Sequence, residues 1–323
     1  MKDNLRIIFM GTPEFAVPSL KMLIREGFHI VAVVTAPDKP AGRGRRLSIP
    51  EVKKAAAGEK LMVFQPEKLK NPEFVREMKK LDPDLMVVVA FRVLPEEVFS
   101  IPRLGTINLH ASLLPNYRGA APINRVIMNG ETTTGLSTFF IEKRIDTGAV
   151  IIREPINIGP DETAGELHDR MKEAGAKLLL RTVKQIRSGS YTTIDQQKLY
   201  SDINELKSAP KIGREDCRIQ WDRDCETIRN QIRGLSPLPG AFTLLRDPGG
   251  KTYQLKILSA GNCIPEETEK PGSIQTDGVS WLHVAAVNAW LPVQKVQLQG
   301  RKSLEIHDFL RGARVDEKWM CEG

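Results

Sequence analysis

Residues 5–35 read LRIIFMGTPEFAVPSLKMLIREGFHIVAVVT. An apolar run, Leu5–Met10, precedes a segment with apolar side chains at helical spacing, Pro13–Glu26, and a second apolar run, Ile30–Thr35, follows. Continuous apolar strands that alternate with helices are typical of a parallel sheet covered on both faces. This segment therefore predicts an α/β domain whose ligand site lies at the carboxyl ends of its strands.

The same alternation continues as far as residue 189. It predicts further strands over Leu61–Phe64, Leu85–Ala90, Thr106–His110, Leu136–Ile141 and Val150–Ile156, and helices over Pro72–Lys80, Ala121–Asn129 and Thr163–Arg187. We therefore assign residues 1–189 to one domain with a mostly parallel sheet.

The pattern changes after residue 189. Residues 190–208 are polar and carry no helical stripe, which predicts a linker. Residues 209–323 hold a helix, Asp224–Gly234, and short strands between turn signals, which predict a small barrel or sandwich. The strands expected there are Tyr253–Ser259, Val279–Ala286, Lys295–Gln297 and Leu304–His307.

Composition narrows the class of protein. The chain has 323 residues, of which 41% are hydrophobic and 27% charged, as in ordinary globular proteins. No apolar run approaches the roughly 18 residues that span a bilayer, and the first residues do not resemble a signal peptide. The four cysteines have no patterned spacing, so we expect a cytoplasmic protein with reduced thiols and no zinc site. These cysteines are Cys217, Cys225, Cys263 and Cys321.

The basic excess is uneven along the chain. Residues 1–200 hold 30 basic and 23 acidic side chains, whereas residues 201–323 hold 17 of each. Such an excess fits either a polyanionic partner or a solvated basic surface. In the second half, some of five arginines spaced four to six residues apart could share one face: Arg214, Arg218, Arg223, Arg229 and Arg233.

Two loops follow the first two strands. Gly11-Thr12-Pro13 stands where a dinucleotide-binding fold carries G-x-G-x-x-G, and the missing glycines argue against NAD or FAD. The loop Pro40–Arg46 contains two glycines and three arginines, and guanidinium forks suit phosphate. Arg43, Arg45 and Arg46 therefore predict a phosphate or nucleic-acid contact, with an exposed solvated loop as the alternative.

The strongest chemical signal is Asn108-Leu109-His110 at the end of a predicted strand. Alternation places Asn108 and His110 on one face, where they could polarise a carbonyl and hold a developing oxyanion. A histidine beside an asparagine is also common as a structural residue. Asp146, in the turn before Gly148, is either a turn residue or a partner that orients His110.

Together these segments resemble the methionyl-tRNA formyltransferase family. The resemblance rests on Asn108-x-His110, Ser112-Leu113-Leu114-Pro115, Arg118–Pro122 and Asp146-Thr147-Gly148, and it extends into the second half through Ile232–Pro237. It implies an enzyme with a Rossmann-like catalytic domain followed by an OB-fold-like β-barrel domain that binds tRNA.

The family's activity implies a role for each matched residue. A formyl group passes from 10-formyltetrahydrofolate, a co-substrate, to the amino group of initiator methionyl-tRNA, with no metal, no membrane and no obligate protein partner. Asn108, His110 and Asp146 would be catalytic, and the Arg43 loop, with Arg45 and Arg46, would contact the tRNA. The folate would lie along Ser112, Leu113, Leu114 and Pro115 and along Val88, Val89, Ala90, Phe91 and Leu94.

Three positions depart from the family pattern, namely Arg144, Ala149 and Leu238. They lie beside the motifs and bear on substrate preference rather than on the reaction. The alternatives are a folate-dependent formyltransferase or hydrolase with a small-molecule acceptor, an RNA-binding protein without catalysis, and a dehydrogenase. The choice of formyl acceptor separates the first of these from the main prediction.

Overall fold

The computed structural model describes residues 5–41 and 46–323, and of Pro40, Ala41 and Arg46 it describes the backbone only. Contacts divide the chain into two compact units. Unit 1 comprises the residues up to 119 together with 134–156 and 168–208, and unit 2 comprises 120–133, 157–167 and 209–323. The chain therefore crosses from one unit to the other five times.

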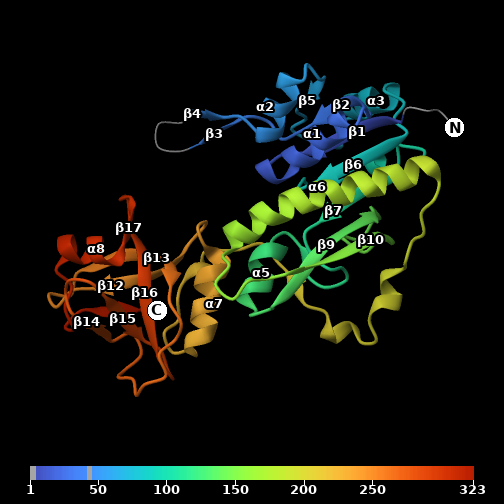
Figure 1. Cartoon of the computed structure of the whole chain (residues 1–323). Coiled ribbons are helices and arrows are strands. Elements are labelled where there is room, and N and C mark those ends of the chain that lie inside the picture. Colours follow the sequence, from blue (N-terminus) through green and yellow to red (C-terminus); the bar gives the residue numbers. More distant parts are fainter. Residues whose placement is uncertain (1–4, 42–45) are drawn as a thin grey trace. The chain divides into compact units, whose positions relative to one another are not determined.

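Unit 1 is built on a seven-stranded sheet in the order β10-β9-β7-β6-β1-β2-β5 (Figure 1). Strands β5, β2, β1, β6 and β7 pair in parallel, and β9 pairs antiparallel with β7, so the predicted mostly parallel sheet is confirmed. The strands are β1 Arg6–Gly11, β2 His29–Val34, β5 Val63–Phe64, β6 Leu85–Val89, β7 Thr106–His110, β9 Thr133–Phe140 and β10 Val150–Asn157. Because the chain builds outward from β1 on both sides, the strand order reverses between β1 and β6.

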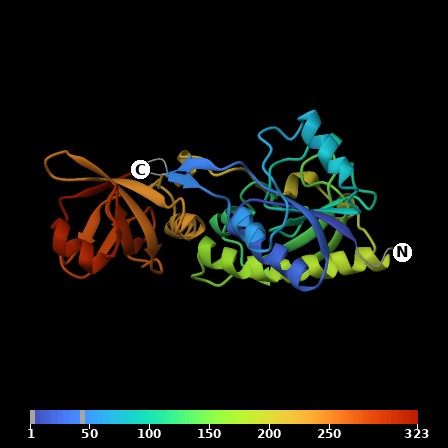
Figure 2. The ribbon, with the colours of Figure 1, turned by 90° about the horizontal axis from the view of Figure 1, so that it is seen from above.

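Helices cover both faces of this sheet. Figure 2 shows α1 and α6 on one side and α3, in cyan, on the other. On the α3 side, Phe74 and Met78 pack in one cluster with Met86 and Val88 of β6. On the α6 side, a Cβ placed on Gly175 would lie 2.9 Å from the Leu109 side chain, so the helix approaches β7 closely. The helices are α1 Val17–Arg25, α2 Glu51–Gly58, α3 Pro72–Lys80, α4 Glu96–Phe99 and α6 Ala164–Ser188, with the 3-10 turn η1 Glu14–Ala16.

Residues 190–208 pack along unit 1. They contain η2 Gln196–Leu199 and η3 Ile203–Glu205, and β11 Ser208–Ala209 pairs with β8 Arg118–Gly119. Val150 and Ile194 exchange two backbone hydrogen bonds of 2.9 and 2.8 Å. The domain limits at 189 and 208 stay a prediction, and the segment between them lies in contact with the sheet domain.

Unit 2 is built on an antiparallel sheet in the order β14-β15-β16-β13-β12-β18, with β17 paired to β16. This half-barrel confirms the predicted OB-like second domain. Its strands are β12 Ala241–Arg246, β13 Thr252–Ala260, β14 Ile274–Thr276, β15 Leu282–Ala285, β16 Trp290–Leu298, β17 Ser303–Glu305 and β18 Met320–Glu322.

The two ends of this sheet meet at Gly272 and Ser273. Ser273 forms an antiparallel bridge with Met320, and the N–H of Cys321 donates to the carbonyl of Gly272 at 2.9 Å. Gly272 has a φ of +91°, and a Cβ there would lie 2.1 Å from the carbonyl oxygen of Cys321. Only glycine fits this junction without displacement of the backbone.

Three helices complete unit 2. They are α5 Pro122–Met128, α7 Cys225–Leu235 and α8 Ile306–Ala313, with the 3-10 turn η4 Glu215–Cys217. Asp224 caps α7 by accepting the N–H of Thr227 at 2.9 Å. The predicted strand Leu304–His307 is wrong in its second half, because β17 ends at Glu305 and α8 begins at Ile306.

The arginines of α7 do not form a basic face. Arg229 and Arg233 are 4% and 8% exposed, and they bind the segment 157–167. Arg229 pairs with Asp161, and Arg233 donates to the carbonyl of Glu162 at 2.9 Å. Burial, together with the neighbouring Arg229, lowers the pKa of Arg233. The hypothesis of a shared polyanion-binding face is therefore wrong for these two side chains, which hold unit 2 together instead.

The expectation of four reduced thiols is also wrong. Cys225 at the start of α7 and Cys263 after β13 form a disulfide with a Cα–Cα distance of 6.1 Å. The two cysteines are 38 residues apart, and only the folded chain brings them together. Closing a loop of this length stabilises the folded state by about 4 kcal/mol through the entropy of the unfolded chain.

A thiol titration tests this pairing. Cys217 and Cys321 are buried, and burial raises the pKa of the Cys321 thiol to about 12 and raises that of Cys217 as well. We expect the folded protein to react slowly with a disulfide reagent, because the thiolate is the reactive form. Denatured but unreduced protein should titrate two thiols and reduced protein four. Four thiols without reduction would contradict the disulfide.

Candidate active site

Strand β7 carries Asn108 and His110 to the carboxyl edge of the unit 1 sheet. Asn108 lies between Val88 of β6 and Phe139 of β9, and His110 lies beside Ser137. Alternation turns both side chains toward the α3 face, whereas Leu109 points to α6. The register agrees with the predicted placement of the pair on one face, and β6 separates β7 from the point where the strand order reverses.

The His110 ring is held from two sides. Its side chain is 8% exposed, and Nε2 lies 2.9 Å from the carbonyl oxygen of Tyr117. A carbonyl only accepts, so Nε2 carries a proton and donates it, and Nδ1 remains for chemistry. Nδ1 lies 3.9 Å from Oδ2 of Asp146. The edge of the ring meets Phe139, with centroids 6.5 Å apart and planes at 84°.

Asp146 reaches His110 through the turn between β9 and β10. The turn is tight, since a Cβ on Gly148 would lie 1.8 Å from the carbonyl oxygen of Phe140. Asp146 itself has a φ of 54°, in the left-handed region that asparagine and aspartate tolerate best. Its Oδ2 accepts the N–H of Gly119 at 2.9 Å. A carboxylate oxygen is thus placed 3.9 Å from Nδ1, the ring nitrogen that remains for chemistry.

The loop after β7 is held by its own polar groups. The Ser112 hydroxyl donates to the carbonyl of Asn116 at 2.6 Å, and the Ser137 hydroxyl donates to the carbonyl of Ser112 at 2.7 Å. The N–H of Leu114 donates to Ser137 Oγ at 3.0 Å. Ser112, Leu114 and Pro115 are buried and Leu113 is half-buried, so Leu113 is the most accessible of these four residues.

The end of β6 presents a different surface. Val88, Val89 and Leu94 are buried in the core, whereas Ala90 is exposed and has a φ of 47°. Phe91 is half-buried beneath the Arg92 guanidinium, which lies 5.4 Å from the ring centroid. Residues 90–93 therefore form the accessible part of this segment, next to Asn108.

The loop predicted to contact tRNA is described by the structure only in part. Arg43, Arg45 and the side chain of Arg46 lie outside the described residues. The flanking strands β3 Lys39–Ala41 and β4 Arg46–Ser48 pair antiparallel. Asp38 anchors them through Lys53 at 2.6 Å and Gln65 at 2.8 Å, and these bonds lower the pKa of its carboxyl.

Comparison with known proteins assigns the family. Residues 5–183 match the model described as formyl transferase, and residues 211–314 match the formyl transferase C-terminal domain. The chain belongs to the formyl transferase family. The resemblance drawn from the sequence motifs is therefore confirmed.

Relatives of this formyl transferase match along nearly the whole chain. The methionyl-tRNA formyltransferase of Bacteroides fragilis is 44% identical over 321 residues, or 99% of each chain. That of Parabacteroides distasonis is 46% identical over 312 residues, or 96% of each chain. A solved sugar 3N-formyl transferase, WlaRD, has 18% identity and a TM-score of 0.63 over 92% of this chain and 99% of its own, which shows a shared fold.

Residues to which the sequence assigned no role in the site also build it. Tyr117 and Gly119 contribute a backbone carbonyl and a backbone N–H, for which side-chain motifs give no signal. Gln196, 1% exposed, lies against the Asp146 turn although it belongs to the predicted linker. Of the departures from the family pattern, Leu238 is 76% exposed and Arg144 lies on the surface of the turn.

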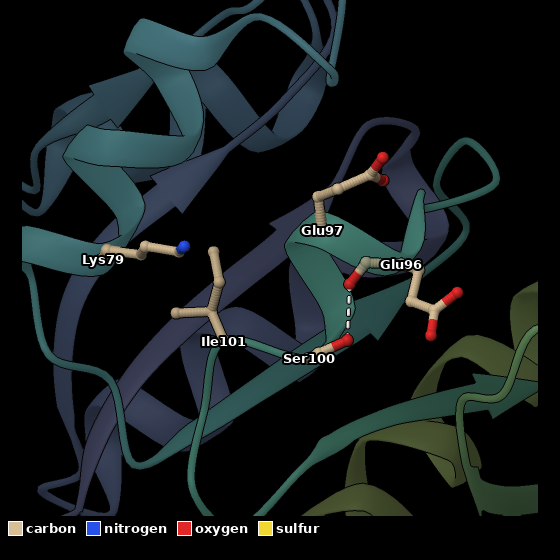
Figure 3. A pocket seen from close by; sticks show the side chains of 5 residues that line it. All are labelled: Lys79, Glu96, Glu97, Ser100 and Ile101. Carbon is tan, nitrogen blue, oxygen red and sulfur yellow. Dashed lines mark hydrogen bonds between the residues drawn. The ribbon is translucent and has the colours of Figure 1, made fainter.

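One hollow on the surface of unit 1 lacks convergent polar groups. A hollow of about 370 Å³ beside α3 and α4 is lined by Lys79, Glu96, Glu97, Ser100 and Ile101. Figure 3 shows Lys79 directed toward Ile101 while both carboxylates point away, so no groups converge there. Within residues 5–41 and 46–323, no three His, Cys, Asp or Glu side chains are placed to hold a metal ion. In that same part of the chain, no helix is both long and apolar enough to cross a bilayer.

Proposed function

We propose that this protein transfers a formyl group from 10-formyltetrahydrofolate to the amino group of initiator methionyl-tRNA. The observation that carries the proposal is the meeting of Asn108, His110 and Asp146 at one sheet edge, in a chain 44–46% identical to methionyl-tRNA formyltransferases. The acceptor follows from these relatives, because the solved sugar formyltransferases share only the fold.

In this proposal the neutral amine attacks the formyl carbon and the carbonyl electrons move onto oxygen. The Asn108 amide and the imidazolium of His110 donate toward that oxyanion, because both side chains face the edge where it forms. Asp146 stabilises the positive ring. The carbon–N10 bond then breaks, the amine loses its proton, and N10 of tetrahydrofolate gains one.

The folate is placed along the β6 end and the loop after β7. The exposed Ala90 and Val93 and the half-buried Phe91 suit a flat, partly apolar molecule. The loop of Ser112, Leu113, Leu114 and Pro115 closes the other side. Val88, Val89 and Leu94 support this surface from the core.

A formyl-transfer assay tests the function. Purified protein is mixed with 10-formyltetrahydrofolate and methionyl initiator tRNA, and formylmethionine is scored after deacylation. We expect product only with charged tRNA and none with uncharged tRNA or free methionine. Consumption of the folate without this product would overturn the tRNA acceptor in favour of a small molecule.

The same assay tests two further parts of the proposal. Turnover by the purified chain alone would support the absence of an obligate protein partner, and turnover in EDTA the absence of a metal. Cytoplasmic location follows from the acceptor, and cell fractionation tests it.

The basic loop gives a separate prediction. Arg43→Ala is expected to raise the KM for methionyl-tRNA about tenfold, because one charge-assisted phosphate contact is lost. The KM for folate should not change. The salt dependence of the tRNA KM should also become shallower. Arg76→Ala, an exposed arginine on α3, is the matched control. Equal effects of both variants would contradict the loop assignment.

A further inference from the structure

Gln196 is a buried polar residue in a segment that otherwise lies on the surface. It opens η2, and its neighbours Asp195 and Gln197 are exposed while its own side chain is 1% exposed. A primary amide has two N–H donors and two carbonyl lone pairs, and burial makes each unpaired one costly.

All four positions of the Gln196 amide are used. Nε2 donates to the carbonyl of Asp146 at 2.9 Å and to that of Gly148 at 2.8 Å. Oε1 accepts from Nε and Nη2 of Arg118 at 3.1 and 2.6 Å. Carbonyls only accept and a guanidinium only donates. Nε2 of Gln196 must therefore face the two carbonyls, and Oε1 must face Arg118.

These bonds hold the turn that carries the Asp146 carboxylate. The Gln196 amide binds the carbonyls of Asp146 and Gly148, the two residues that flank Thr147. The backbone of Asp146 at this point is left-handed. Arg118, at the other end of the chain of bonds, precedes Gly119, whose N–H donates to the same carboxylate. The turn is thus clamped to β8 at two points, through the side chain of Gln196 and through the backbone of Gly119.

We propose that Gln196 is a positioning residue that holds the Asp146 carboxylate against His110, with Arg118 fixing its orientation. The inference rests on the proposed function. Gln196 acts through the backbone of Asp146 and touches no reacting group. Without its donors, two buried carbonyls lose their partners and the left-handed turn is free to relax, which moves the carboxylate from Nδ1 of His110.

The test uses a variant of nearly the same shape. Gln196→Glu keeps an acceptor for Arg118 but cannot donate to both carbonyls, and Gln196→Met keeps only the volume. We expect either change to lower kcat about 10–100-fold, since a displacement of about 1 Å at a catalytic group costs that much. Both KM values should stay within about threefold. Gln197→Ala, the exposed neighbour, should match the wild type.

A double variant separates positioning from general destabilisation. If Gln196 acts through Asp146, then Gln196→Glu should cause no further loss of kcat in an Asp146→Asn background. Independent, multiplicative losses would overturn the proposal, as would a kcat within twofold of wild type in Gln196→Glu. Higher KM values at unchanged kcat would overturn it too, because they indicate a binding role.

A measurement without catalysis distinguishes this proposal from the proposed function. Gln196→Glu and Asp146→Asn should shift the His110 ring resonances in NMR spectra, and Gln197→Ala should not. If the wild type does not formylate methionyl-tRNA, the proposed function fails and this comparison still tests Gln196. Unmoved His110 resonances in Gln196→Glu would refute the positioning role.

Discussion

Asn108→Ala and His110→Ala are each expected to lower the kcat of formyl transfer by about 10²–10³-fold, the usual cost of removing one oxyanion donor. Both side chains lie on one face of β7, so each loss removes a hydrogen bond that strengthens as negative charge develops on the formyl oxygen. The KM for either substrate should change far less than kcat. Steady-state kinetics with both substrates varied measures the split.

The controls for these variants concern charge and fold. Asp146→Asn keeps a residue that tolerates the left-handed backbone and removes only the charge beside His110. The decrease in kcat of this variant therefore measures the contribution of that negative charge. His29→Ala removes an exposed histidine at the start of β2, which is separated from β7 by β6 and β1, and should behave like the wild type. Near-wild-type rates in all three site variants would show that the site lies elsewhere.

Gly272→Ala is expected to destabilise unit 2 by about 2–5 kcal/mol. The left-handed φ of +91° costs an alanine about 1–2 kcal/mol. The clash at 2.1 Å with the carbonyl of Cys321 adds about 1–3 kcal/mol, because backbone rather than a flexible side chain must move. In a domain of this size the melting temperature should fall by roughly 10–20 °C.

Gly250→Ala isolates the cost of the backbone conformation. Gly250 has a φ of +87° and no atom within 4 Å of an added Cβ, so the change should cost only about 1 kcal/mol. Thermal and urea unfolding of the two variants compares them directly. Equal losses would mean that the sheet ends are not in contact at Gly272 in solution.

The sequence predicted the elements of unit 1 well and two features of unit 2 poorly. Pro72–Lys80 and Thr106–His110 have the bounds expected from the apolar pattern, because each is buried along a regular face. Helix α8 was missed because its buried Ile306, Phe309 and Leu310 span little more than one turn and directly follow a strand. The disulfide was missed because spacing along the chain says nothing about which cysteines meet.

The candidate site was predictable in its side chains and not in its geometry. Asn108 and His110 are two residues apart on one strand, so alternation alone places them together. Asp146 meets His110 through a turn that depends on Gly148, on the N–H of Gly119 and on the distant Gln196. Such contacts join residues up to 50 positions apart, which local pattern does not reveal.

The interleaving of the two units bears on how such proteins recombine. A fragment that starts at residue 209 leaves behind 157–167, which supplies partners to the buried Arg229 and Arg233. It also leaves behind α5, whose Asn124 donates to the carbonyl of Gly234 at 2.7 Å. A single genetic crossover between the halves therefore removes some of the partners of two buried arginines, which keep only Glu226 and Asn230, and it uncovers one side of α7. Unit 2 is complete only when it includes residues 120–133 and 157–167, which lie in the sequence between parts of unit 1. The second half of the chain alone is therefore not a transferable module.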